Sequence, residues 1–388
     1  MAKKTTAKNI NLKELLGIDF TNCVSRTKPK KMDATFLLLV IIIACFGLIM
    51  LLSASAPAGS AKYNNSYAYF IKQFGFAVFG FVAMMVISKF DYRKIKPFAK
   101  TLMIIAEILL VLVLIIGVEH QGARRWLYTG FEWQPSEIMK LAIAVFFARL
   151  VEDGKKELSD IKSMIPYIGW MGVTALLLMM ETHLSGTIII CGIGVIILIV
   201  AGAKLRYFFG LAAVGGPLAV LFLRTDPVRW SRVVNLFDPF SDMQGVGYQV
   251  VQGLYAVATG GFFGLGLGQS VQKYSYLPEP YNDFIYAIIC EELGLFGGLV
   301  VMLLFAGLIL RGIKIASEAP DVFGSIMVVG IMSQIAIQTI LNIAVVTSTL
   351  PNTGVALPFF SYGGTSLVML FAEMGIVLSV SRYSRKGI

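Results

Sequence analysis

The chain has 388 residues, of which 57% are hydrophobic and only 14% are charged. Soluble domains carry about 25% charged residues, so this composition, with a mean hydropathy of +0.76, excludes a soluble protein. The formal net charge of +10 would suggest nucleic-acid binding in a soluble chain, but here the basic residues gather in alternate loops, as orientation signals do, and no nucleic-acid partner is expected.

Long apolar segments dominate the chain. The run 34-ATFLLLVIIIACFGLIMLLSA-54 is uninterrupted and fits a helix of about 20 residues, whereas a membrane β-barrel would show short alternating segments. We therefore predict an all-α integral membrane protein with about ten transmembrane helices. The predicted spans are 34–55, 69–88, 99–117, 136–151, 164–181, 185–203, 205–223, 284–310, 322–346 and 363–382.

Loop charges predict the orientation and the domain limits. Lys and Arg are frequent before the first span, in every second loop and after the last span, so both termini are predicted to be cytoplasmic. Segment 1–33 is expected to be a disordered basic cytoplasmic tail, too long for the basic region of a signal peptide. Residues 34–383 form a single polytopic domain, and 384–388 are a cytoplasmic C-terminal tail. One long extracytoplasmic loop is expected at about 224–283.

Arginines on the predicted outer side break the charge rule. They are Arg124, Arg125, Arg224, Arg229 and Arg232. Three explanations are open: binding of lipid headgroups, pairing with the nearby acids Asp226, Asp238 and Glu132, or binding of an anionic substrate.

The stretch 122-GARRWLYTGFEWQPSEIMKLA-142 contains a helix start. Pro135 suits the first turn and Glu137 favours the positive end of the helix dipole. Lys140 follows Glu137 by three residues, so the two side chains share a face and can pair. A lysine inside a membrane segment suggests function, while the alternative is a structural pair near the outer interface.

Two further outer stretches have ordinary interpretations beside functional ones. In 181-ETHLSGT-187, His183 could move protons or could be a polar side chain of a tight turn. The aromatic segment 226–250 is expected to form short amphipathic helices on the membrane surface. The glycines of 260-GGFFGLGLGQS-270 follow no strand, so flexible backbone is favoured over a phosphate-binding loop.

The stretch 277-LPEPYNDFIYAIICEELG-294 holds four acids. Its two prolines prevent a helix until about residue 281, which puts Asp283 in the first turn at the outer interface. There it could be a reactive carboxylate or a helix cap. Glu291 lies about 12 Å deeper along the helix, too far to act with Asp283. Glu291 and Glu292 are therefore expected to satisfy a basic partner within the bundle.

The stretch 351-PNTGVALPFFSYGGTSL-367 predicts non-helical backbone at membrane depth. Such backbone is tolerated where it lines a cavity or packs on protein. Ser361 and Thr365 could offer hydroxyl groups to a ligand there.

Together, "GARRWL…QPSEIMKLA", "GGFFGLGLGQSVQKYSYLPEPYNDFIYAIICEELG" and "LPFFSYGGTSL" resemble the signature segments of the SEDS family, the shape, elongation, division and sporulation proteins of bacterial cell-wall synthesis. The likeness covers nearly all of 34–383. The basic tail and the segment "TGVALPFFSYGG" are more similar to those of the division and sporulation members (the FtsW and SpoVE type) than to those of the elongation member RodA. The turn "ETHLSGT" departs from the Pro-Asp-x-Gly found in many members, which leaves its role open.

The resemblance implies a peptidoglycan glycosyltransferase in the bacterial cytoplasmic membrane, at the division septum. Its substrate would be lipid II, an undecaprenyl-pyrophosphate disaccharide-pentapeptide, polymerised on the outer face. Asp283 matches the catalytic aspartate of the family and would act as a general base. The candidate substrate-binding residues are Arg124, Lys140, Glu137, Glu279 and Ser361.

The resemblance also implies partners: a class B penicillin-binding protein with transpeptidase activity, and other division proteins. A divalent cation, Mg or Mn, could assist, although no metal ligands are identified. The alternatives to a glycosyltransferase are a lipid II flippase and a non-catalytic scaffold for division proteins.

Overall fold

In the computed structural model, the described residues are 28–120, 123–154, 158, 160–225, 227–236, 238–245 and 247–384. The predictions for residues 1–27 of the basic tail and for 385–388 of the C-terminal tail lie outside these ranges.

Each of the ten predicted spans coincides with a helix. They are α2 (Ala34–Tyr63), α3 (Ala68–Ile87), α4 (Ala99–Ile116), α5 (Pro135–Asp153), α6 (Ile161–Met180), α7 (Leu184–Val200), α8 (Leu205–Arg224), α11 (Ile285–Ser317), α12 (Val322–Val346) and α13 (Gly364–Ser381). A 3-10 turn, η1 (Tyr92–Phe98), leads directly into α4. Within the described residues, seven of these elements are long and apolar enough to cross a membrane, counting η1 with α4 as one, and α7 is a shorter apolar helix. The prediction of an all-α membrane fold is confirmed.

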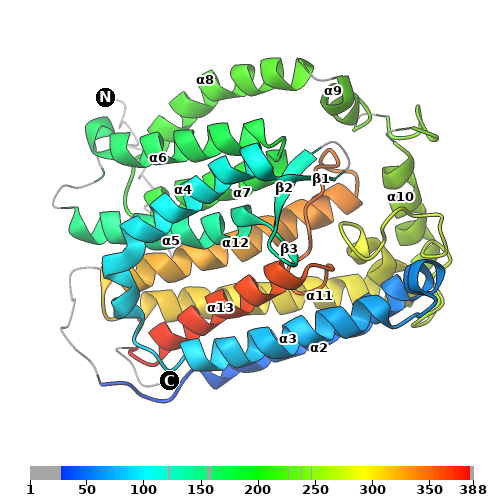
Figure 1. The fold of residues 1–388 in the computed structure, drawn as a ribbon, viewed down its shortest axis with the longest axis horizontal. Coiled ribbons are helices and arrows are strands. Elements are labelled where there is room, and N and C mark those ends of the chain that lie inside the picture. Colours follow the sequence, from blue (N-terminus) through cyan, green and yellow to red (C-terminus); the bar gives the residue numbers. More distant parts are fainter. Residues whose placement is uncertain are drawn as a thin grey trace, which may run out of the picture.

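The helices run side by side along the long axis of the molecule (Figure 1). The Lys30 amide donates to the Arg382 carbonyl (2.7 Å), and the Asp33 amide donates to the Ser381 hydroxyl (3.1 Å). The start of α2 and the end of α13 therefore lie at the same end of the bundle. The small β-strands and the short helices of the long loop gather at the opposite end.

Helix α12 lies at the centre of the bundle, where it contacts α5, α7 and α11. In its most apolar window, 72% of the residues are buried inside the protein, against 22% in α3, whose other side chains face outward. Helix α8 lies along one edge of the bundle (Figure 1).

The outer segment between α4 and α5 folds into a small antiparallel sheet. Strands β1 (Val118–His120), β2 (Ala123–Tyr128) and β3 (Glu132–Trp133) pair in chain order. Gly130 makes the turn between β2 and β3 with φ +93, a conformation that favours glycine. Strands this short carry too little alternation to be predicted from sequence.

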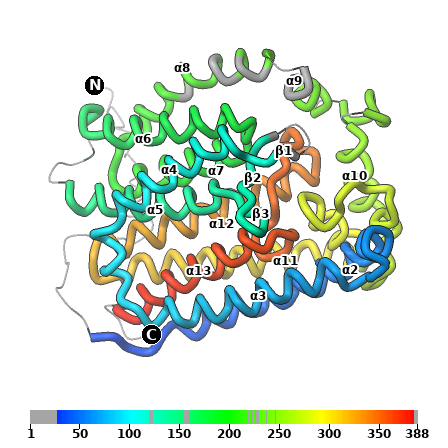
Figure 2. The backbone as a smooth tube through the Cα atoms, in the orientation of Figure 1, coloured from blue at the N-terminus to red at the C-terminus, as the bar shows by residue number. Residues whose placement is uncertain are grey.

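The long loop contains two further helices, α9 (Pro227–Val234) and α10 (Tyr248–Gly260), so the expected short helices are present. After α10 the chain runs without helix or strand as far as α11, and this path can be followed in the backbone tube (Figure 2). The helical start of α11 is Ile285, one residue after the start of the predicted span 284–310, and turns occupy the residues from Pro280 to Phe284.

The expectation of flexible backbone in the glycine-rich stretch is wrong. Helix α11 is broken at Gly294, where φ is 69 and ψ is −167. The Leu265 and Gly266 amides donate to the Glu291 and Glu292 carbonyls (2.9 and 3.0 Å), and the Leu295 amide donates to the Gly261 carbonyl (2.9 Å). The glycine-rich loop thus satisfies the backbone groups that the break in α11 leaves without helical partners.

Candidate active site

Asp283 lies at the outer end of the bundle, just before α11. The N-cap residue of α11 is Phe284, which makes no side-chain capping bond, so Asp283 does not cap this helix. Asn342 of α12 donates through its amide nitrogen to the carbonyls of Asp283 and Val355, each at 2.7 Å. This single side chain ties the Asp283 backbone to the non-helical stretch before α13.

Ser361 holds the same segment from the other side. Its hydroxyl donates to the Asn282 carbonyl (2.6 Å) and accepts from the Leu357 amide (2.8 Å). The Tyr362 amide also donates to the Tyr281 carbonyl (2.9 Å). Ser361 is buried, and these contacts indicate that it positions the Asp283 segment; its predicted contact with substrate stays a prediction.

A polar cavity of about 70 Å³ lies beside Asp283. The polar side chains in its wall are Gln134, Ser136, Glu137, Lys140, His183, Ser185 and Gln338. Gly354 also lines it, and a β-carbon on Gly354 would lie 3.0 Å from Asp283 Oδ2. The Asp283 carboxylate therefore lies behind Gly354, the lining residue that separates it from the cavity.

Burial, with a smaller contribution from the nearby Glu279 carboxylate, raises the pKa of Asp283 to about 6, against the opposing influence of Arg125 and Arg232. A carboxylate with a pKa near neutral can both accept and release a proton at physiological pH. Glu279 itself is in an exposed turn, where its carboxylate accepts from the Asn282 side chain (2.8 Å).

The predicted pair of Glu137 and Lys140 forms. The Lys140 Nζ lies 2.8 Å from Glu137 Oε2, and both side chains are largely buried in the cavity wall. The Ser366 hydroxyl donates to Glu137 (2.9 Å), and Lys140 also reaches Gln338 (3.5 Å). The pair joins α5 to α12 and α13 and keeps one cation at the cavity.

The two adjacent arginines of β2 lie in different surroundings. Arg124 pairs with Glu119 (3.2 Å), and both side chains are more than half exposed. Arg125 is partly buried and donates to the Thr182 carbonyl (2.6 Å), and its positive charge opposes the rise in the pKa of Asp283. The sequence analysis named Arg124 as a substrate-binding candidate and left Arg125 among the five outer arginines whose role was open; the alternation of side chains along a strand is the signal that separates the two.

His183 is a cavity residue that sequence reasoning treated mainly as a turn residue. Its ring nitrogens lie 3.3 and 3.4 Å from the Gln134 amide nitrogen. Burial, with smaller contributions from the cations Arg125 and Lys140, lowers the pKa of His183 to about 3, so the imidazole is neutral. In the same turn, burial raises the pKa of Glu181 to about 8, against the influence of Arg125.

No group of three or more His, Cys, Asp or Glu residues close enough to hold a metal occurs in the described parts of the chain. Asp283 and Glu279 are the carboxylates that the structure brings together at this site. Two carboxylates suit Mg²⁺ when phosphate groups of a substrate complete its coordination.

Known proteins resemble the chain over nearly its whole length. Stage V sporulation protein E of Bacillus subtilis (strain 168) is 42% identical over 363 residues, which cover 92% of this chain and 99% of that protein. A probable peptidoglycan glycosyltransferase FtsW of Geobacter sp. (strain M18) is 35% identical over 357 residues, covering 91% and 97%.

The fold also matches a solved structure, from work on the structural coordination of polymerization and crosslinking by a peptidoglycan synthase complex. The TM-score is 0.76 at 25% identity, over 90% of this chain and 98% of that one. The sequence model of the FtsW, RodA and SpoVE proteins, described as "Cell cycle protein", matches residues 33–386. The chain therefore belongs to the SEDS family.

Proposed function

We propose that this chain is a peptidoglycan glycosyltransferase that polymerises lipid II on the outer face of the cytoplasmic membrane during cell division. The observation that carries the proposal is the position of Asp283: a carboxylate of near-neutral pKa beside a polar cavity whose wall contains Lys140. Membership of the family and the FtsW relative's name support the same activity.

In the proposed reaction, Asp283 is the general base. It accepts the proton of the acceptor sugar 4-hydroxyl, and the oxygen attacks the anomeric carbon of the donor sugar. The bond from that carbon to the diphosphate oxygen breaks, and the diphosphate leaves with its lipid. A positioned base of this kind contributes about 10²–10⁴-fold to the rate.

The cations around the site would stabilise the leaving diphosphate. Arg125 and Arg232 act on Asp283 electrostatically, and Lys140 lies in the cavity wall. Fixed positive groups stabilise charge that develops on a leaving group. Glu137 would hold Lys140 in place, and Arg124 and Glu279 are further candidates for substrate contact at the rim. A divalent cation bound by Asp283 and Glu279 would supply additional positive charge there.

We further propose that the chain works with a class B penicillin-binding protein and with other division proteins at the septum. The structural likeness to a chain from a peptidoglycan synthase complex supports a partner that crosslinks the polymer.

A lipid II flippase is the second candidate. One observation favours it: Glu373 of α13 is fully buried near the middle of its helix, where it accepts from Gln334 of α12 (3.0 Å). Charged groups deep in a helical bundle are typical of transport pathways. Asp283, Arg125, Lys140 and the long loop, in contrast, all belong to the outer end.

The decisive experiment is polymerisation of lipid II by the purified protein in detergent, with glycan length read on a gel. Asp283→Asn should lower the rate by about 10²–10⁴-fold while the protein elutes and melts as the unmodified chain does. A normal rate for Asp283→Asn would exclude the general-base role. No polymer from the unmodified chain, alone or with its transpeptidase, would favour the flippase or the scaffold.

A further inference from the structure

Asp283 precedes a short helical segment of α11, which we call the arm. The arm is not continuous with the membrane-spanning part of α11. The break at Gly294 divides α11 into an outer part, 285–293, and an inner part, 295–317. Asp283 immediately precedes the outer part. Its place at the cavity therefore depends on what holds the outer part at a fixed angle over the inner part, in addition to Asn342 and Ser361, which hold the Asp283 segment directly.

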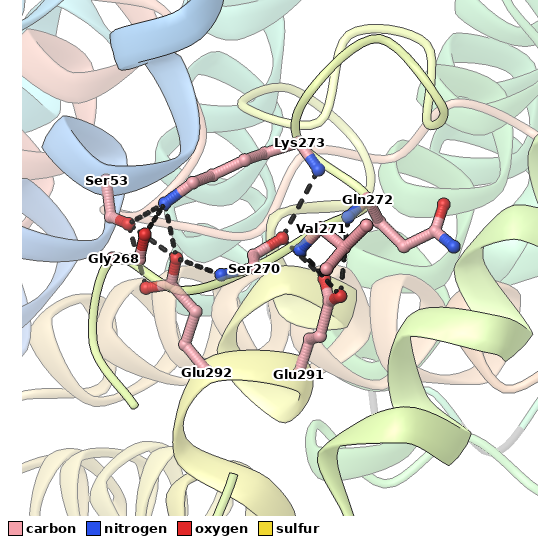
Figure 3. A network of polar contacts seen from close by, with 8 residues as sticks. All are labelled: Ser53, Gly268, Ser270, Val271, Gln272, Lys273, Glu291 and Glu292. Atoms are coloured by element: carbon pink, nitrogen blue, oxygen red, sulfur yellow. Dashed lines mark hydrogen bonds and ion pairs between the residues drawn. The ribbon is translucent and has the colours of Figure 1, made fainter. Parts of the chain in front are cut away.

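A buried polar cluster lies at this break (Figure 3). The Lys273 Nζ is 2.8 Å from Glu292 Oε1, and the Ser53 hydroxyl of α2 donates to the same carboxylate at 2.6 Å. Lys273 also donates to the Gly268 carbonyl (2.8 Å) and to Ser53 (3.0 Å). We call the set Ser53, Lys273 and Glu292 the clasp, because it joins α2, the loop and the outer part of α11.

The neighbouring Glu291 holds the adjoining stretch of the same loop. Its carboxylate accepts from the Ser270 hydroxyl (2.5 Å), the Val271 amide (2.9 Å) and the Gln272 amide (3.3 Å), as Figure 3 shows. Two consecutive glutamates thus bind successive residues of the loop that leads to Asp283. The expected basic partner exists for Glu292, but Lys273 comes from the loop and not from a spanning helix, and Glu291 is held by a hydroxyl and two amides instead.

The burial of the clasp makes it sensitive to the loss of one member. The side chains of Lys273 and Glu292 are 4% and 0% exposed. A buried charge without its partner is strongly unfavourable. A protein that loses Lys273 or Glu292 is therefore expected to change its conformation until water reaches the charge that remains. The loss also removes the contacts that tie α2 and the loop to the outer part of α11, which the break at Gly294 separates from the inner part.

We propose that Lys273 and Glu292 are positioning residues that lock the outer part of α11 against α2 and thereby hold Asp283 at the cavity. The inference rests on the proposed role of Asp283 as the base. The clasp does not touch the cavity, so it acts on the reaction only through the place it gives Asp283.

The chain contains a matched control for this clasp. Arg311 lies in the inner part of α11 and pairs with Asp33, just before α2, at 2.8 Å, and Asp33 is 1% exposed. Arg311→Met therefore breaks a buried ion pair between the same two segments, at the other end of the bundle. It tests whether any loss of an α2–α11 ion pair has the same effect.

The first measurement is kinetic. Lys273→Met should lower kcat by about 10²-fold, the effect of a displacement of about 1 Å at a reacting group, with KM for lipid II nearly unchanged. The double variant Lys273→Met/Glu292→Gln leaves no unpaired charge and should melt near the unmodified protein, yet its kcat should stay low. Arg311→Met should lower the melting temperature and leave kcat nearly unchanged.

The second measurement reports on the loop that leads from Lys273 to Asp283 and the outer part of α11, and it needs no activity. Spin labels at Lys62→Cys, at the end of α2, and Tyr276→Cys, in an exposed part of the loop, are placed in a chain whose native cysteines are replaced by alanine. Pulsed electron paramagnetic resonance should give one narrow distance distribution, broadened by Lys273→Met and by the double variant but not by Arg311→Met.

An unchanged distribution in Lys273→Met would overturn the proposal, as would equal broadening by Arg311→Met or a broadened distribution with a normal kcat. If the unmodified chain makes no polymer, the proposed function fails, while the distance measurement still decides whether the clasp holds the loop that leads to Asp283 against α2.

Discussion

Gly354 lies so close to Asp283 that a β-carbon at position 354 would come within 3.0 Å of Asp283 Oδ2. Gly354 also has φ +68, a conformation that costs other residues about 1–2 kcal/mol. The residue between the cavity and the carboxylate is thus limited to glycine for two independent reasons.

Gly354→Ala should lower the polymerisation rate at saturating lipid II by about tenfold or more, because the added methyl group displaces the Asp283 carboxylate. Gly202→Ala is the control, since Gly202 has φ +101 but open space where a β-carbon would lie. The control should lose stability and little activity. Equal losses of activity in both variants would mean that backbone strain alone is responsible.

The pH dependence of the reaction should report the ionisation of Asp283. The base works only when deprotonated, so the rate should rise with pH, with a midpoint near the Asp283 pKa of about 6, and level off above it. Initial rates between pH 5 and pH 8, at lipid II concentrations well below KM, would measure this midpoint, because kcat/KM reports the ionisation of the free enzyme.

Two substitutions should move that midpoint in opposite directions. Arg125 favours the ionised form of Asp283, so Arg125→Gln should move the midpoint to higher pH. Glu279 disfavours it, so Glu279→Gln should move the midpoint to lower pH. Shifts in one common direction, or none, would show that the titrating group is not Asp283.

The adjacent arginines of β2 should differ in their effect on catalysis. Arg125→Gln should lower kcat/KM by about 10²–10³-fold, since a fixed positive group near the reacting atoms is lost. Arg124→Gln should have the smaller effect, because Arg124 pairs with Glu119 on an exposed face, where ion pairs contribute about 0–1 kcal/mol. A larger loss of kcat/KM for Arg124→Gln would show that Arg124, the residue chosen from sequence, stabilises the leaving diphosphate.

The Glu137–Lys140 pair should affect both stability and rate. Lys140→Met leaves Glu137 buried with only Ser366 beside its carboxylate and should destabilise the protein by about 3–5 kcal/mol. Lys140→Met/Glu137→Gln should recover most of the melting temperature in detergent but not the polymerisation rate, since the cation stays absent. Recovery of both would assign the pair a purely structural role.

The membrane helices and the choice of Asp283 follow from local sequence. Uninterrupted apolar runs predict spanning helices because backbone polar groups in lipid must bond within the segment, and all ten predicted spans coincide with helices. Proline and glycine mark the non-helical stretches around residues 277–284 and 351–364. The charged residues placed among them narrowed the candidates for chemistry to a few positions.

Other features depend on contacts between distant residues and could not be predicted. The spacing of residues in the sequence does not show which face of a short strand packs inward. For this reason Arg124, and not Arg125, was named as the substrate-binding candidate. Nor does it tell that the glycines at 260–268 bond to the break in α11, or that Lys273 meets Glu292 and Ser53.

The sequence by itself determined the positions of the apolar helices and the family, and it singled out Asp283 as the candidate base, because hydropathy, helix-breaking residues and motifs are properties of neighbours along the chain. Only the tertiary structure decided that Asp283 does not cap α11, which cations surround it, and what fixes the arm that follows it. Those are set by close packing and by the high cost of a buried charge without a partner, which act between residues up to 239 positions apart, as between Ser53 and Glu292.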